Sequence, residues 1–311
     1  MSLSDPPGST GLPPPGRPTA TLASSPSESV DHTGAAFAPV GPVTRPHRTL
    51  TGYYGNEAQR RQYVRRIFDE TAIDYDRIER ILAFGSGRWY RGQALRRAGV
   101  GRGATVLDVG CGTGLLAREA LALIGPQGRL VGVDPSPGML AQAGFGGAEF
   151  LEGSAEALPV EGQSFDFVTM GYALRHIGDV QAAFREFHRV LKPGGTVLVL
   201  EITKPAGAVA TAALKAYMRG VVPLIARAVS RVEGTPEIWR YFWDTIEACV
   251  PPQRVLDTLL DVGFTRVRRQ VELGLFSEYL AMKPLAAVGP GNAVNPTGTS
   301  IGTSTGTSRS L

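Results

Sequence analysis

The glycine loop DVGCGTG at residues 108–114 restricts the fold of this chain more than any other feature of its sequence. It follows an apolar run, residues 105–109, that is typical of a buried strand, and it precedes residues 115–123, whose apolar positions have helical spacing. A glycine loop between a strand and a helix is typical of open parallel α/β sheets, in which ligands bind at the carboxyl ends of the strands.

The loop also limits the kind of ligand. Its glycines let the backbone approach a ligand closely, and the amino end of the following helix favours a negative group. The dinucleotide-binding pattern G-x-G-x-x-G would need glycine where this chain has Leu115. The observed G-x-G-x-G, which follows Asp108, therefore favours a ligand with a carboxylate and without a pyrophosphate.

Periodicity predicts the rest of the sheet. Apolar runs predict further strands at residues 129–134, 148–152, 165–170, 196–202, 267–271 and 276–281, and helical spacing predicts helices at 62–82, 179–191 and 251–262. Strands separated by helix-length segments predict an α/β, doubly wound, Rossmann-like fold. We expect a mainly parallel seven-stranded sheet with helices on both faces and a helical substrate lid.

Composition divides the chain into segments. Residues 1–47 and 285–311 are rich in Gly, Pro, Ser and Thr, which predicts a disordered extension at each end. Between them we expect N-terminal cap helices at 48–100, a binding core at 101–205 and 251–284, and a helical lid insertion at 206–250.

Charge and cysteine content exclude several classes of protein. A net charge of +4 on 311 residues, without a long basic run, gives no reason to expect a nucleic-acid partner. Two cysteines exclude a disulfide scaffold and a four-cysteine zinc site, and no metal is predicted. The first residues lack the apolar region of a secretory signal, and no uncharged apolar stretch of about 20 residues predicts a transmembrane helix. We therefore expect a cytoplasmic protein.

Asp134 ends the second predicted strand, at the same edge of the sheet as the glycine loop. A carboxylate at this position can accept hydrogen bonds from both hydroxyls of a ribose. The alternative is an ordinary surface aspartate at a strand end. The register of Asp134 with the loop favours the ribose interpretation.

Four motifs carry a resemblance to class I S-adenosylmethionine-dependent methyltransferases: VLDVGCGTG (106–114), VGVDPSPGML (131–140), SFDFVTM (164–170) and RVLKPGGTVLV (189–199). The resemblance covers about residues 100–204 and implies S-adenosyl-L-methionine as the cofactor. It implies that the glycine loop holds the methionine part, Asp134 the ribose and the 153–155 turn the adenine. The cofactor-binding residues predicted in this way are Asp108, Gly110, Gly112, Thr113, Gly114, Asp134, Ser154, Ala155 and Gly171.

Further motifs resemble the ubiquinone/menaquinone biosynthesis C-methyltransferases over about residues 62–284: FDETAIDYD (68–76), EGSAEALP (152–159), YALRH (172–176) and LEITKP (200–205). The resemblance implies methylation of a ring carbon of a prenylated quinol or phenol. The chain departs from the family pattern at Glu79, Ser154, Gly171 and His176. Two alternatives therefore stay open: an O- or N-methyltransferase on an aromatic secondary metabolite, and a non-catalytic S-adenosylmethionine-binding partner protein.

A ring carbon becomes nucleophilic when the adjacent hydroxyl loses its proton, so the site needs a donor or cation at that oxygen and a base. The resemblance implies Arg175 for phenolate stabilisation, with a helix cap or salt bridge as the alternative. His176 suits a general base because its ordinary pKa is near 6.5, with structural hydrogen bonding as the alternative. We expect an aromatic wall around the acceptor, although such residues are also typical of a core: Tyr75, Phe84, Trp89 and Tyr172.

Residues 206–230 combine apolar positions at helical spacing with cations such as Lys215 and Arg227. Such a stretch can cover an apolar acceptor and touch an anionic membrane surface, or it can be ordinary core packing. The expected partner is a small-molecule quinol or phenol. Peripheral contact with the inner membrane face and a homodimer are left open.

Overall fold

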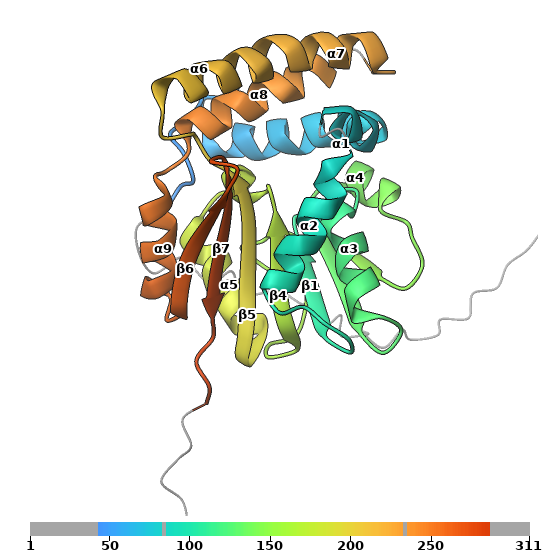
Figure 1. The fold of residues 1–311 in the computed structure, drawn as a ribbon, viewed down its shortest axis with the longest axis vertical. Helices are drawn as coiled ribbons and strands as arrows, with labels where there is room; N and C mark the ends of the chain where they lie inside the picture. Colours follow the sequence, from blue (N-terminus) through green and yellow to red (C-terminus); the bar gives the residue numbers. More distant parts are fainter. Residues whose placement is uncertain (1–42, 83–84, 233–234, 287–311) are drawn as a thin grey trace, which may run out of the picture. The chain divides into compact units, whose positions relative to one another are not determined.

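The structure is a computed structural model that describes residues 43–82, 85–232 and 235–286. Its sheet has the strand order β3-β2-β1-β4-β5-β7-β6 (Figure 1). The first five of these strands pair in parallel, and β7 runs antiparallel to both β5 and β6. The strands are β1 (Thr105–Val109), β2 (Arg129–Asp134), β3 (Glu149–Glu152), β4 (Phe165–Gly171), β5 (Leu191–Ile202), β6 (Thr265–Glu272) and β7 (Phe276–Met282). The expected α/β fold is confirmed.

Alternation along β5 explains why the sheet is covered on both faces. Val197 and Val199 belong to one core cluster with α5 and α9, whereas Leu198 and Leu200 belong to another with α2 and α3. Successive side chains of a strand point to opposite faces, so an unbroken apolar run requires helices on both sides. The helices concerned are α2 (Ser86–Arg97), α3 (Leu115–Ile124), α5 (Val180–Val190) and α9 (Pro252–Asp261).

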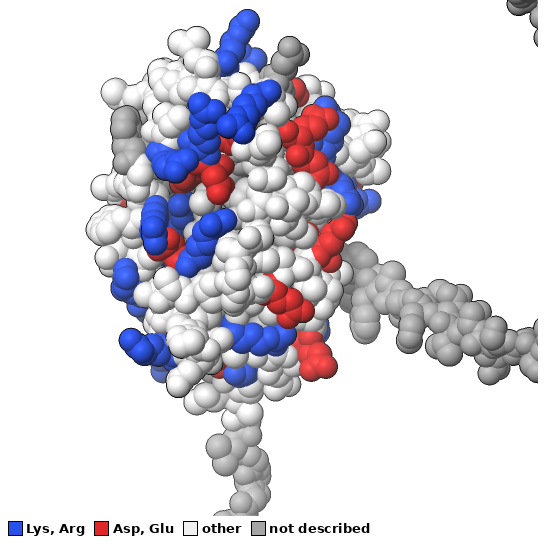
Figure 2. Space-filling view, turned by 90° about the vertical axis from the view of Figure 1, so that its right-hand side faces the viewer, with Lys and Arg blue, Asp and Glu red and all other residues white. Residues whose placement is uncertain are grey.

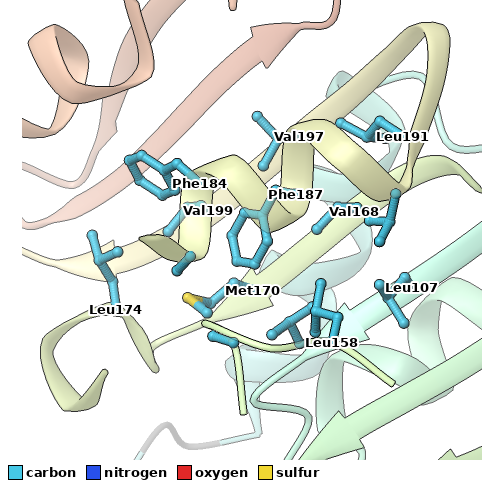
Figure 3. Close-up of a cluster of buried hydrophobic side chains, with 14 of the residues drawn as sticks. Leu107, Leu158, Val168, Met170, Leu174, Phe184, Phe187, Leu191, Val197 and Val199 are labelled. Carbon is cyan, nitrogen blue, oxygen red and sulfur yellow. The ribbon is translucent and has the colours of Figure 1, made fainter. Parts of the chain in front are cut away.

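The cluster beneath α5 contains large aromatic side chains. Phe184 and Phe187 of α5 are fully buried and lie over Val168 and Met170 of β4 (Figure 3). Removing a ring of this size from a core costs about 3–5 kcal/mol. This packing fixes β4, whose carboxyl end carries the site residues described below.

A third cluster forms a helical layer beyond the carboxyl ends of the parallel strands (Figure 1). It joins Tyr63 and Ile67 of α1 with Met218 of η2, Val222 of α7 and Trp239 of α8, and the last three lie within the predicted lid insertion at 206–250. The remaining elements are α1 (Glu57–Leu82), α4 (Pro137–Gln142), the 3₁₀ turn η1 (Leu174–His176), α6 (Ala208–Ala216), the π-helical turn η2 (Tyr217–Val221), α7 (Val222–Val229) and α8 (Thr235–Ala248). The sequence interpretation did not separate α4 and α8 from their surroundings.

The prediction that the disordered N-terminal extension reaches residue 47 is wrong for residues 43–47, which the structure describes. The carbonyl oxygen of Thr44 accepts a hydrogen bond from the Val180 N–H at 2.8 Å, and that of Pro46 accepts one from Val250 at 2.8 Å. His47 is buried and forms a β-bridge with Cys249. Residues 1–42 and 287–311, which hold most of the two predicted disordered segments, lie outside the described residues.

The apolar stretch at 206–230 forms α6, η2 and α7 in direct succession. Pro223 lies in the first turn of α7 and has no N–H to donate. The wider π turn before it accommodates this break in the helical hydrogen-bond pattern.

Candidate active site

The glycine loop lies at the carboxyl end of β1, where the order of the strands reverses between β1 and β4. The N–H groups of Gly110 and Cys111 donate to the Val133 carbonyl oxygen at 2.7 and 3.1 Å. Gly110 has φ of +63°, and a Cβ there would lie 2.6 Å from the Cβ of Ala173. A Cβ on Gly112 would meet nothing within 4 Å. The loop therefore packs directly on the protein at Gly110, whereas at Gly112 it leaves open space. Such space beside the loop is what a bound ligand requires.

Asp134 connects the end of β2 to this loop. Its Oδ2 accepts a hydrogen bond from the Gly112 N–H at 2.8 Å, and its Oδ1 accepts one from the Ser136 N–H at 2.9 Å. Burial raises the pKa of Asp134 to about 6, although these two N–H groups lower it. Each carboxylate oxygen can accept more than one hydrogen bond, so Asp134 can still bind two hydroxyl groups.

Asp108 is fully buried at the end of β1. Its Oδ1 accepts a hydrogen bond from the Thr169 hydroxyl at 2.7 Å, and its Oδ2 has no partner within hydrogen-bond distance among the described residues, although the nearby Ala117 N–H lowers the pKa of this carboxyl. Burial raises the pKa of Asp108 to about 7. An unpartnered buried carboxylate oxygen beside the loop fits the ammonium group of an amino-acid ligand. The residues present thus fit the cofactor that the sequence resemblance implies.

The other predicted cofactor residues lie along the same edge of the sheet. The Gly153 N–H donates to the Asp134 carbonyl oxygen at 3.2 Å, which places the turn with Ser154 and Ala155 next to Asp134. Gly171 ends β4, where a Cβ would lie 3.2 Å from Leu116. Gly114 begins α3 with φ of +83°. How these residues contact the cofactor stays a prediction.

Two carboxylates of α1 accept hydrogen bonds from residues at this edge of the sheet. The sequence interpretation missed both of them. Asp76 accepts a hydrogen bond from the Thr113 hydroxyl, so Thr113 faces α1. Asp69 accepts one from the Ser136 hydroxyl at 2.6 Å and one from the Gly138 N–H at 2.9 Å. Both acids stand in the FDETAIDYD motif, which was the available signal.

Arg175 and Glu201 form a buried ion pair. Each side chain is 1% exposed, and Nη1 of Arg175 donates to Oε1 of Glu201. Nε of Arg175 donates to the Thr245 hydroxyl at 3.1 Å, and its guanidinium lies 5.0 Å from the centre of the Phe242 ring. Burial raises the pKa of Glu201, and the charge of Arg175 opposes this rise. The salt-bridge alternative for Arg175 therefore holds, and any role in catalysis is additional.

His176 lies in a packed cluster of aromatic side chains from α1 and α8, which we call the aromatic chamber. Its ring centre is 5.2 Å from that of Phe68, 5.5 Å from that of Tyr241 and 5.4 Å from that of Phe242. Both ring nitrogens are buried and have no partner among the described residues. Burial and the Arg175 charge hold the pKa of His176 well below 6.5, so the imidazole is neutral. The chamber therefore contains a free acceptor of hydrogen bonds.

The residues of the predicted aromatic wall do not lie together in the structure. Tyr75 stacks on Trp239 with ring centres 6.0 Å apart and lies 6.5 Å from Phe68, so it belongs to the chamber. Tyr172, at the end of β4, contacts Phe276 at 6.4 Å, and burial raises its pKa. Trp89 is 66% exposed on α2. The structure thus does not bring Trp89 to the chamber, and Phe84 lies outside the described residues.

The α8 helix supplies chamber residues that the sequence interpretation missed. Trp239, Tyr241 and Phe242 are buried, and the indole N–H of Trp239 has no partner among the described residues. The aromatic run IWRYFW at 238–243 was the signal that could have identified them.

We expect affinity for S-adenosylhomocysteine to fall as the pH is lowered from about 8 to about 5. The carboxyls of Asp108 and Asp134, with pKa values of about 7 and about 6, take up protons over this range in the ligand-free protein. Below such a pKa, each pH unit weakens binding to the ionised form by up to about tenfold. Titration calorimetry at several pH values measures this, and D108N should show a flatter profile. Equal affinity at about pH 8 and 5 would contradict the prediction.

No group of three or more His, Cys, Asp or Glu side chains that could hold a metal ion occurs in residues 43–82, 85–232 and 235–286.

Comparison with known proteins agrees with this site. A family model described as the ubiE/COQ5 methyltransferase family matches residues 56–283. The ubiquinone/menaquinone biosynthesis C-methyltransferase UbiE of Hahella chejuensis is 33% identical over 211 residues, which are 65% of this chain and 83% of that protein. The enzyme of the same name from Pseudomonas fluorescens is 32% identical over 237 residues, 73% of this chain and 91% of that protein.

A solved structure supports the fold alone. Phosphoethanolamine N-methyltransferase 2 of Haemonchus contortus, in complex with phosphomonomethylethanolamine and S-adenosylhomocysteine, matches with a TM-score of 0.51 at 19% identity. The match covers 71% of this chain and 60% of that chain. The glycine loop, the acidic strand ends and the family match lead to one conclusion: this chain belongs to the ubiE/COQ5 methyltransferase family and is an S-adenosylmethionine-dependent methyltransferase.

Proposed function

We propose that this enzyme methylates a ring carbon of a quinol-like or phenolic, prenylated acceptor, as the names of its relatives in ubiquinone/menaquinone biosynthesis suggest. The observation that carries the proposal is the chamber around His176, which combines aromatic rings with two unpartnered ring nitrogens. A flat ring packs favourably among aromatic side chains. Its hydroxyl would give His176 the hydrogen-bond partner that it lacks.

We assign different roles toward the acceptor to His176, Arg175 and Tyr75. When bound, S-adenosylmethionine supplies an electrophilic methyl group on a positively charged sulfur. The neutral imidazole of His176 accepts the hydrogen bond of the acceptor hydroxyl and takes up its proton as the ring carbon is methylated. The methylated carbon then loses its own hydrogen as a proton, which restores the aromatic ring. Arg175 stabilises the resulting oxygen anion, since its Nη2 makes no hydrogen bond within the described part of the chain. Tyr75 holds the ring in line, which can contribute several kcal/mol.

We expect H176F to lower kcat by about a hundredfold or more, because phenylalanine keeps the packing of the ring but removes the proton acceptor. Affinity for S-adenosylhomocysteine should stay within about twofold. The control is H188F, since His188 lies on α5 against Phe264. Steady-state kinetics with the acceptor and calorimetry with the cofactor product measure both effects. Unchanged kcat in H176F would assign His176 a structural role.

Product analysis tests the proposed reaction. The full-length enzyme is incubated with S-adenosylmethionine and a reduced, prenylated demethylquinol, and the position of the new methyl group is determined by NMR. A new carbon–methyl bond supports the proposal, and a methyl group on oxygen or nitrogen would support the O- or N-methyltransferase alternative. Cofactor binding without turnover of this quinol or simple phenols would favour a non-catalytic binding protein.

The location and assembly of the enzyme are part of the proposal. A prenylated acceptor resides in a membrane, so we place the enzyme in the cytoplasm with peripheral contact at the inner membrane face. We also propose a homodimer, which light scattering of the purified protein tests by its molar mass.

A further inference from the structure

The helical lid presents an apolar surface that nothing in the described protein covers. Val209 of α6 is 85% exposed and Leu224 of α7 is 70% exposed, and Val221 between them is also exposed. No residue of α6 is buried. Within the described residues, Ala208–Val229 is the helix whose length and composition would allow it to cross a membrane, and 17% of its most apolar window is buried.

All charged side chains in this segment are basic. Residues 202–232 contain no Asp or Glu. Their cations are Lys204, Lys215, Arg219, Arg227 and Arg231. Several basic side chains lie close together at the top of Figure 2, the end at which Figure 1 places α7, with acidic side chains beside them. Such a surface favours an anionic partner.

A groove joins the cations to the apolar surface. η2, α7 and the beginning of α8 border an open hollow of about 740 Å³. It is lined by Pro223 and Leu224 together with Arg219, Arg227, Arg231, Glu237 and Arg240. The one carboxylate, Glu237, accepts a hydrogen bond from the Tyr63 hydroxyl at 2.9 Å.

Three of these arginines are available to bind a ligand. Arg227, Arg231 and Arg240 are exposed, and their side chains form no ion pair with a described residue. Arg219 lies 3.6 Å from Asp244. Three guanidinium groups around one hollow suit a phosphate group, which accepts several charge-assisted hydrogen bonds.

The segment is suited to lie on a membrane rather than to cross it. Lys215, Arg219 and Arg227 interrupt it, and charged residues at the bilayer centre are costly. Met218 and Val222 are buried against the other helices of the layer. A second copy of this chain is a poor partner, because a symmetric contact through this face would bring the same arginines together.

We propose that the α6–α7 lid docks on an anionic phospholipid bilayer, with lipid phosphates in the arginine groove and Val209, Val221 and Leu224 at the acyl boundary. This surface supplies the membrane contact proposed above and therefore rests on that location. Binding to lipid is measured without a methyl acceptor, so it is independent of the proposed reaction.

Vesicle flotation of the full-length protein tests the docking surface. We expect binding to vesicles of equal phosphatidylglycerol and phosphatidylcholine, weakening as salt is raised, and little binding to phosphatidylcholine alone. Since each cation near an anionic surface contributes about 1 kcal/mol, R227Q/R231Q/R240Q should weaken binding about a hundredfold. L224S should weaken it several-fold.

Matched variants separate the groove from net charge. R102Q/R254Q/R268Q removes the same charge from exposed positions elsewhere, and L260S removes an exposed leucine from α9. Both should bind vesicles as the unmodified protein does, and S-adenosylhomocysteine binding shows that all variants are folded. Equal losses in the two triple variants, or no binding of the unmodified protein to anionic vesicles, would overturn the proposal. Lipid binding without quinol methylation would leave docking intact and reject the proposed reaction alone.

Discussion

E201A is expected to lower the free energy of unfolding by about 3–5 kcal/mol, because it leaves the Arg175 guanidinium buried without its counter-ion. Both side chains are 1% exposed, so water cannot replace the lost carboxylate without a rearrangement. The bond to Thr245 and the contact with Phe242 hold Arg175 in place. Urea denaturation followed by circular dichroism measures the change.

An exposed ion pair serves as the control for the loss of stability expected in E201A. E149A removes the carboxylate partner of Arg129, a pair at 3.2 Å in which both side chains are about half exposed. Exposed pairs contribute about 0–1 kcal/mol, so E149A should change stability by no more than that. E201Q keeps a hydrogen-bond acceptor and should fall between the two. A loss in E201A as small as that in E149A would show that Arg175 does not depend on this carboxylate.

D134A is expected to weaken binding of S-adenosylhomocysteine at least about a hundredfold. The substitution removes an acceptor for ribose hydroxyls, and hydrogen bonds to a charged group contribute about 1.5–3 kcal/mol each. It also leaves the N–H groups of Gly112 and Ser136 without their acceptor, which loosens the loop. Titration calorimetry measures the loss.

A neighbouring carboxylate controls for charge at the same edge of the sheet. Glu152 ends β3, pairs with Asp134 in the strand register and is exposed. E152A should bind S-adenosylhomocysteine within about twofold of the unmodified protein. Unchanged affinity in D134A would mean that the ribose is held by other residues.

The central strands were predictable because they lie between two helical layers. A strand that is buried on both faces has a continuous apolar run, and the predicted bounds of 105–109 and 129–134 agree with β1 and β2. The edge strand β6 is less regular: its exposed and half-buried positions extend beyond the predicted 267–271 to Thr265–Glu272. Its boundaries therefore depend on pairing with β7, which the sequence pattern does not contain.

Contacts between distant segments were the part that could not be predicted. Glu201 lies in a motif that was recognised, yet its pairing with Arg175 depends on β4 and β5 being neighbours in the sheet. Likewise, Thr113 lies in the glycine loop, but its hydroxyl faces Asp76 of α1. Helical spacing could not distinguish Tyr75, inside the chamber, from Trp89, on the surface.

Two adjacent residues of α1 connect the two halves of the site. Tyr75 lies in the aromatic chamber and Asp76 accepts a hydrogen bond from the glycine loop, so one helix contacts both the proposed acceptor site and the predicted cofactor site. A ligand that moves α1 on one side changes the free energy of binding on the other, by an amount that is equal in both directions. Under the proposed function, the hydrogen bond between Asp76 and Thr113 is therefore expected to make the affinities for acceptor and cofactor interdependent.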